Sequence, residues 1–82
     1  MPEFQLGKRY RMSGNGPIDP DNGKFAGFNT YDLIGQTVEI FAGKVSIGHE
    51  TVTEENRMSF AIVMLRYGVE FVVLESVTSN VA

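Results

Sequence analysis

The stretch VEFVVL at residues 69–74 is the part of this sequence that decides the fold. β-Branched and aromatic residues dominate it, and apolar side chains stand at both alternating positions, so both faces of a strand here would be apolar. A strand of this kind lies in the centre of a sheet or is covered on both sides. We therefore expect a mainly β protein in which this segment is a central strand.

Residues 37–47 have the pattern of a β-hairpin. Apolar and polar residues alternate on both sides of the Ala-Gly-Lys sequence at 42–44, which can turn the chain. In this register Glu39 and Ser46 face solvent. The hairpin supplies two further strands of the expected sheet.

Residues 3–12 alternate in the same way. Tyr10 and Met12 fall on one side of the predicted strand, and Arg9 and Arg11 fall on the other. We expect a half-buried strand whose two arginines project from the solvent side.

Residues 53–67 fit two interpretations. As a helix, the segment would be capped by Thr53, carry Arg66 in its last turn and end at Gly68. That helix would be apolar almost all round from Phe60 onward, which is too much apolar surface for so small a domain. We therefore favour a strand at residues 59–67 that turns at Tyr67 and Gly68 into the adjacent antiparallel strand at 69–74, and a helix near 54–67 is the alternative.

The chain is expected to form a single domain, residues 1–82, with one long Gly/Pro-rich loop at 13–36. Inside that loop, residues 17–28 are predicted to form a tight turn or short ribbon. The expected fold is a small curled antiparallel sheet or an SH3-like, partly open barrel, and the alternative is an α+β fold with one helix. The chain is too short to cover every strand twice, so the sheet closes on itself or a second copy covers it, and homo-oligomerisation stays open.

The composition excludes several kinds of site. The chain has no cysteine and one histidine, His49, so it lacks disulfides, thiolate sites and the usual zinc site. The segment DPDNG at 19–23 has its glycine one position too early for a calcium loop. We expect no enzymatic activity, no cofactor and no metal ion. The apolar runs are too short to cross a bilayer and no secretory signal is present, which predicts a cytoplasmic protein without a membrane partner.

The candidate binding residues are basic and aromatic. Arg9 and Arg11 share a strand face and could grip one anion together, while a neighbouring aromatic ring stacks on a base. The alternative is that the arginines form a solvated strand face and that the aromatic residues belong to the core. The full candidate set is Lys8, Arg9, Tyr10, Arg11, Phe25, Phe28 and Tyr31.

The opening FQLGKRY at residues 4–10 resembles the start of many small phage-encoded accessory proteins. Those proteins begin with an aromatic residue, a Gly-Lys pair and a tyrosine that lead into a compact β fold. The resemblance implies a host antagonist that acts by binding in the host cytoplasm. It would inhibit a host enzyme or act as a sponge for a nucleotide signal.

Three functional hypotheses follow. The first is a non-enzymatic binding module, a small inhibitor or adaptor that binds a protein partner, because the chain is short, acidic (net charge −3) and 43% apolar. The second is an oligomeric sponge in which Arg9 and Arg11 hold a phosphate-bearing nucleotide. The third is an SH3-like module that contacts nucleic acid through the same strand, which the negative net charge does not favour.

Overall fold

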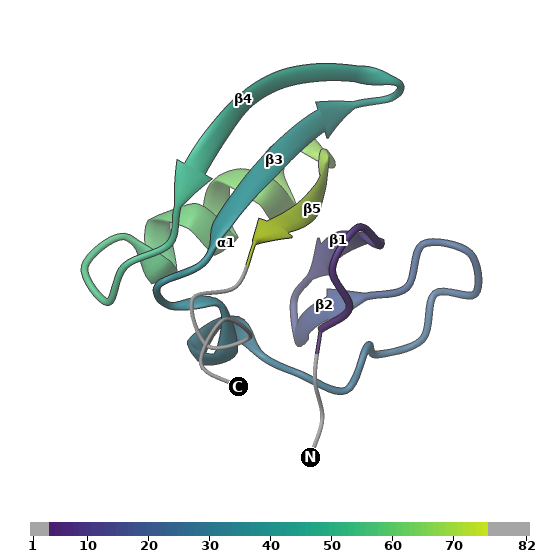
Figure 1. Ribbon diagram of the computed structural model, residues 1–82. Helices are drawn as coiled ribbons and strands as arrows, with labels where there is room; N and C mark the ends of the chain where they lie inside the picture. The colour runs from purple at the N-terminus through teal and green to yellow at the C-terminus, as the bar shows by residue number, and fades with distance from the viewer. Residues whose placement is uncertain (1–3, 76–82) are drawn as a thin grey trace.

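The computed structural model describes residues 4–75, which form one five-stranded antiparallel sheet and two helices. The strand order is β2-β1-β5-β3-β4, and α1 lies against one face of the sheet (Figure 1). The mainly β fold predicted from the sequence is confirmed, as a curled sheet with β2 and β4 at its edges. In chain order the elements are β1 (Arg9–Ser13), β2 (Gly16–Ile18), the 3₁₀ helix η1 (Thr30–Leu33), β3 (Thr37–Ala42), β4 (Val45–Thr51), α1 (Arg57–Tyr67) and β5 (Glu70–Glu75).

Strand β5 is the central strand, as its apolar sequence predicts. It pairs with β1 along one edge and with β3 along the other. Phe71 and Val73 are fully buried on the side of α1, and Val72, which faces the opposite side, is only 9% exposed. The face of β5 towards α1 is therefore covered, whereas on the open face Val72 is buried and Leu74 is 43% exposed.

A single hydrophobic core lies between the sheet and α1. Its aromatic rings meet edge to face: Tyr10 and Phe28 have ring centroids 4.9 Å apart, and Phe60 and Phe71 have centroids 5.8 Å apart. The buried Tyr10 hydroxyl accepts a hydrogen bond of 2.8 Å from the backbone N–H of Gln5. The remaining buried apolar side chains of this core are Met12, Leu33, Val38, Val52, Met64, Val69 and Val73.

The segment at residues 57–67 is a helix, so the strand favoured at 59–67 from the sequence is wrong, whereas the strand expected after it is β5. Thr53 and Asn56 fix the turn that precedes α1. The Thr53 hydroxyl accepts from the Asn56 N–H (3.0 Å), and the Asn56 side-chain oxygen accepts from the Thr53 N–H (2.8 Å). Gly68 ends the helix in the left-handed region, with φ of 63°. None of the helices in the described residues is long and apolar enough to cross a membrane.

The predicted hairpin is confirmed as β3 and β4, which curve away from the rest of the sheet in Figure 1. The Ser46 hydroxyl donates to the Glu39 carboxylate at 2.7 Å on the open face of the sheet. A β-bulge interrupts the register next to Ile40, and bulges of this kind bend a strand pair. The curvature of the sheet therefore has a local cause.

The region predicted as a long loop contains two regular elements, β2 and η1. The chain between them forms the expected short ribbon, closed by a bridge between Ile18 and Phe25. The first strand is shorter than predicted, because β1 begins at Arg9 and a turn occupies the residues before it. Within β1 the predicted sidedness is confirmed: Tyr10 is buried, and Arg11 faces outward.

Candidate functional site

Helix α1 exposes an unusual amount of apolar surface. Only Phe60 and Met64 of its side chains are fully buried. Most of the others are also apolar, and five of them are between 44% and 69% exposed: Met58, Ile62, Val63, Leu65 and Tyr67. A helix at these residues was not favoured from the sequence because its apolar side chains could not all be buried, and in the structure these side chains are exposed.

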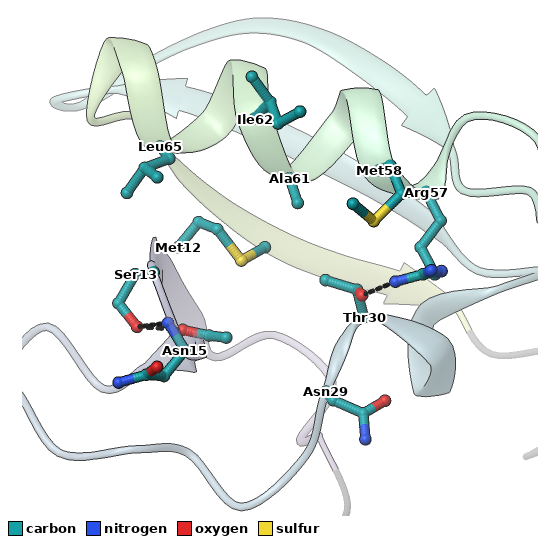
Figure 2. A pocket seen from close by; sticks show the side chains of 12 residues that line it. Met12, Ser13, Asn15, Asn29, Thr30, Arg57, Met58, Ala61, Ile62 and Leu65 are labelled. Carbon is teal, nitrogen blue, oxygen red and sulfur yellow. Dashed lines mark hydrogen bonds between the residues drawn. The ribbon is translucent and has the colours of Figure 1, made fainter.

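An apolar groove of about 300 Å³ runs along one side of this helix (Figure 2). We call it the α1 groove. One wall is α1 itself, the side chain of Met12 lies below it, and the opposite wall is formed by residues 13–16 and 29–30. The helix residues that line the groove are Arg57, Met58, Ala61, Ile62 and Leu65.

The spacing of the sequence builds this groove. Met58, Ala61, Ile62 and Leu65 follow one another at three- and four-residue intervals, which places them along one side of a helix. The wall facing them is held by short-range hydrogen bonds. The Ser13 hydroxyl donates to the Gly16 carbonyl at 2.6 Å and accepts from the Asn15 N–H at 3.3 Å. These hydrogen bonds order the part of the opposite wall that residues 13–16 form.

Arg57 lies at one end of the groove. Its guanidinium donates a hydrogen bond of 2.9 Å to the Thr30 hydroxyl and lies 3.7 Å from the centroid of the Tyr31 ring (Figure 2 shows the Thr30 contact). Tyr31 is one of the predicted site residues, and it is 63% exposed. Tyr31 helps to hold Arg57 at the end of the groove by stacking on its guanidinium, and Arg57 was not among the residues predicted from the sequence.

Arg9 and Arg11 share the open face of the sheet, as predicted, but a carboxylate already lies between them. Glu70 accepts from Arg9 at 3.3 Å and from Arg11 at 3.2 Å. Arg9 also stacks over the Phe41 ring at 4.1 Å and donates to the Gly43 carbonyl at 2.6 Å. The positive charge of Arg9 and Arg11, which would attract a phosphate, is therefore partly neutralised by Glu70.

The other predicted site residues divide between the core and a second, more polar pocket. Tyr10 and Phe28 are 2% and 1% exposed and belong to the core, and Tyr10 also lines this second pocket. Lys8 and Phe25 line a pocket of about 280 Å³ that also contains Lys24. We call it the Lys8 pocket.

An ion pair between Lys8 and Asp19 (3.1 Å) sits in the Lys8 pocket. The hydrogen bond to Asp19 raises the pKa of Lys8. The backbone N–H of Asp21, which donates to Asp19 at 2.9 Å, and then Lys8 itself lower the pKa of the Asp19 carboxyl. Both groups are charged near neutral pH and offset each other, while Lys24 leaves the pocket lining with one excess positive charge.

His49 has no partner arrangement suited to catalysis within the described residues. Its Nε2 lies 3.8 Å from a carboxylate oxygen of Glu39 on the open face, and its side chain is 56% exposed. Residues 4–75 contain no cluster of three or more histidine, cysteine, aspartate or glutamate side chains that could hold a metal ion.

The α1 groove was not predicted from the sequence, although its signal was present. A helix at residues 57–67 that is apolar on nearly all sides is either deeply buried or leaves apolar surface exposed. In this structure five apolar side chains of α1 are exposed, and three of them line the groove.

Comparison of the chain with protein-family models, with curated proteins and with solved structures gave no match. The resemblance of residues 4–10 to small phage-encoded proteins therefore stays a hypothesis.

Proposed function

We propose that this protein is a binding module that holds a protein partner in the α1 groove. The observation that carries the proposal is the apolar, exposed side of α1 next to a preformed groove. Large apolar patches on a small domain mark interaction sites, because leaving such surface in water is unfavourable.

The layout of the groove matches that of a protein interface. Its middle is apolar, from Met58 and Leu65 on the helix to Met12 below. Its ends and far wall are polar, with Asn15, Asn29, Thr30 and Arg57. An apolar centre within a polar rim is the usual anatomy of protein interfaces. Fully burying a side chain such as Leu or Met stabilises a complex by about 1.5–3 kcal/mol, so the half-exposed Met58 and Leu65 each offer roughly half of that.

The experiment is a comparison of two lysine variants. The tagged protein is used to capture partners from an extract of its own organism, alongside Leu65→Lys in the groove and Ile47→Lys on β4. Ile47 is 57% exposed and Leu65 is 50% exposed, but Ile47 does not line the groove. A partner recovered in equal molar amount by the wild type and Ile47→Lys, and lost with Leu65→Lys, supports the proposal. Equal recovery by all three proteins, or no stoichiometric partner, contradicts it.

A second candidate function is binding of a phosphate-bearing nucleotide in the Lys8 pocket. The observation that favours it is the meeting of Lys8, Lys24 and the exposed Phe25 ring in one pocket. Lysine attracts phosphate, and an exposed aromatic ring stacks on a base. Titration with ADP by calorimetry tests it: Lys24→Gln and Phe25→Ala should weaken binding, while Lys44→Gln at the β3–β4 turn should not. Absence of binding to the wild type removes this candidate.

A further inference from the structure

We propose that the α1 groove takes a segment of another protein that presents apolar side chains beside an aspartate or glutamate, whose carboxylate pairs with Arg57. The inference rests on the proposed function and deepens it. It names the chemistry of the partner, because the groove is apolar along its length and ends at a positively charged group.

Arg57 is a charged group without an ionic partner in residues 4–75. The ion pairs of that part of the chain use Lys8, Arg9, Arg11 and His49 as cations. Arg57 makes one side-chain hydrogen bond there, to the neutral hydroxyl of Thr30. A guanidinium has five N–H donors, so most of them remain available to a carboxylate.

Arg57 is also held in place, which separates it from Lys24 and Lys44. Those two lysines and Arg66 are exposed, whereas Arg57 is half-buried, stacked 3.7 Å from the Tyr31 ring centroid and bonded to Thr30. An arginine fixed in this way has already lost much of its rotamer freedom, so less entropy is lost when it pairs. The apolar groove beside it lowers the local dielectric constant, which strengthens a charge pair formed there.

The α1 helix of a second copy fits the groove poorly. The apolar groove residues of α1 span 58–65, and the helix carries two charged residues, Arg57 and Arg66. Antiparallel α1 helices related by a two-fold axis at the middle of that span would set Arg57 of each copy opposite Arg66 of the other. A parallel arrangement would set Arg57 opposite Arg57. Both arrangements oppose like charges, whereas an acidic partner supplies the missing opposite charge.

The test begins with the full chain and a displayed library of random linear peptides. Selected peptides are synthesised with a fluorophore, and their Kd values are measured by anisotropy. We expect the selected sequences to carry an Asp or Glu close to apolar residues. Changing that residue to Asn or Gln in the peptide should weaken binding by about tenfold or more, as expected for a hydrogen bond to a charged group. This change leaves the protein untouched, so misfolding cannot mimic the result.

A double-mutant cycle then assigns the carboxylate to Arg57. Arg57→Gln should weaken binding of the acidic peptide by the same factor. It should hardly change binding of the peptide in which Asn or Gln replaces the acidic residue. Arg57→Lys should retain part of the affinity, because it keeps the charge but loses the two-pronged geometry. Far-ultraviolet circular dichroism and Tm values confirm that the variants are folded.

The outcomes separate the inference from the proposed function. If Leu65→Lys abolishes peptide binding but Arg57→Gln does not weaken it, the groove binds a protein segment and the acidic chemistry is wrong. If neither variant weakens binding, or if no peptide is selected, both fail. A wild-type dimer in sedimentation that Leu65→Lys dissociates would show that a second copy occupies the groove. Displacement of the fluorescent peptide by dodecanoate at lower concentration than by unlabelled peptide would point to a lipid carboxylate, and also overturns the inference.

Discussion

Lys8 and Asp19 tie the turn before β1 to the ribbon that follows β2, and their charges make this link sensitive to pH. The Asp19 pKa lies below its ordinary value of 3.8, because a backbone N–H and Lys8 stabilise the carboxylate. A carboxyl group whose pKa is lowered by folding contributes stability above its unfolded-state pKa, and that contribution is lost as the pH falls through the folded-state value. The Lys8 pKa is raised above 10.5, so its contribution is present below that pH and disappears in stronger base.

We therefore expect Asp19→Asn to lower the free energy of unfolding near pH 7 and to have little effect in strong acid, about pH 2. The asparagine can still accept the hydrogen bond from the Asp21 N–H, so the variant isolates the charge. Urea unfolding followed by circular dichroism at several pH values measures the difference. Glu54→Gln, at an exposed carboxylate that makes no ion pair within residues 4–75, is the control. If Asp19→Asn lowers the free energy of unfolding by the same amount at about pH 2 as at pH 7, the ionised carboxylate of Asp19 is not the source of the effect.

Glu70 decides whether Arg9 and Arg11 can bind an external anion. Its carboxylate is shared by the two guanidinium groups, which are only partly buried. Glu70→Gln should cost about 0.5–1 kcal/mol of stability, as for partly exposed ion pairs. It should also increase the stabilisation given by inorganic pyrophosphate, because two unneutralised arginines then face the ligand. Thermal unfolding with and without pyrophosphate, at constant ionic strength, measures this. An equal Tm shift in both proteins would show that the arginines do not form an anion site.

At the scale of elements, α1 shows where the sequence stops being decisive. Val69 to Leu74 and the hairpin around Gly43 were predicted correctly, because alternation and turn chemistry act locally. Residues 57–67 were not, because apolar residues at nearly every position satisfy a helix and a strand equally. The turn formed by Thr53 and Asn56 before α1 and the Gly68 end of the helix decide between the two, and only the structure shows that the Thr53–Asn56 hydrogen bonds form.

The candidate site likewise has parts that the sequence predicts and parts that it does not. Arg9 and Arg11 were correctly placed on one face, since the two-residue period of a strand fixes sidedness. Their neutralisation by Glu70 could not be foreseen, because the two segments lie 61 residues apart in the sequence for the Arg9 contact. The α1 groove was missed for a related reason. It lies between a helix and a turn that only the tertiary structure brings together.

Gly68 is the residue that allows α1 to end and β5 to begin. Its φ of 63° is a conformation that residues with a Cβ rarely adopt, although a methyl group there would meet no atom within 4 Å. Gly68→Ala should therefore cost about 1 kcal/mol through backbone strain alone. Gly14→Ala is the matched control, because that glycine has an ordinary backbone conformation and equally open surroundings. It should be neutral or stabilise by up to about 1 kcal/mol. Urea denaturation distinguishes the two, and equal effects would argue against strain at Gly68.

At the scale of the whole molecule, the core depends on β5. Phe71 is fully buried, packs against Tyr10 and Phe60, and belongs to the strand that joins the two halves of the sheet. Phe71→Ala should cost about 3–5 kcal/mol. That is a large part of the roughly 4–12 kcal/mol expected for a domain of this length. Phe25→Ala, at a ring that is 55% exposed, should stay within about 0.5 kcal/mol. Calorimetric Tm values for both variants test this, and similar losses would place Phe25 in the core.

The central position of β5 also constrains how the protein is made. During synthesis β1, β2 and the β3–β4 hairpin leave the ribosome first, but each half of the sheet presents an unpaired edge until β5 lies between them. The contacts that join the halves span most of the described chain, and long-range pairing of this kind slows folding. We therefore expect the core of the nascent chain to form only after residues 70–75 have emerged and joined the two halves of the sheet. Until then its exposed strand edges are open to chaperones and to other nascent chains.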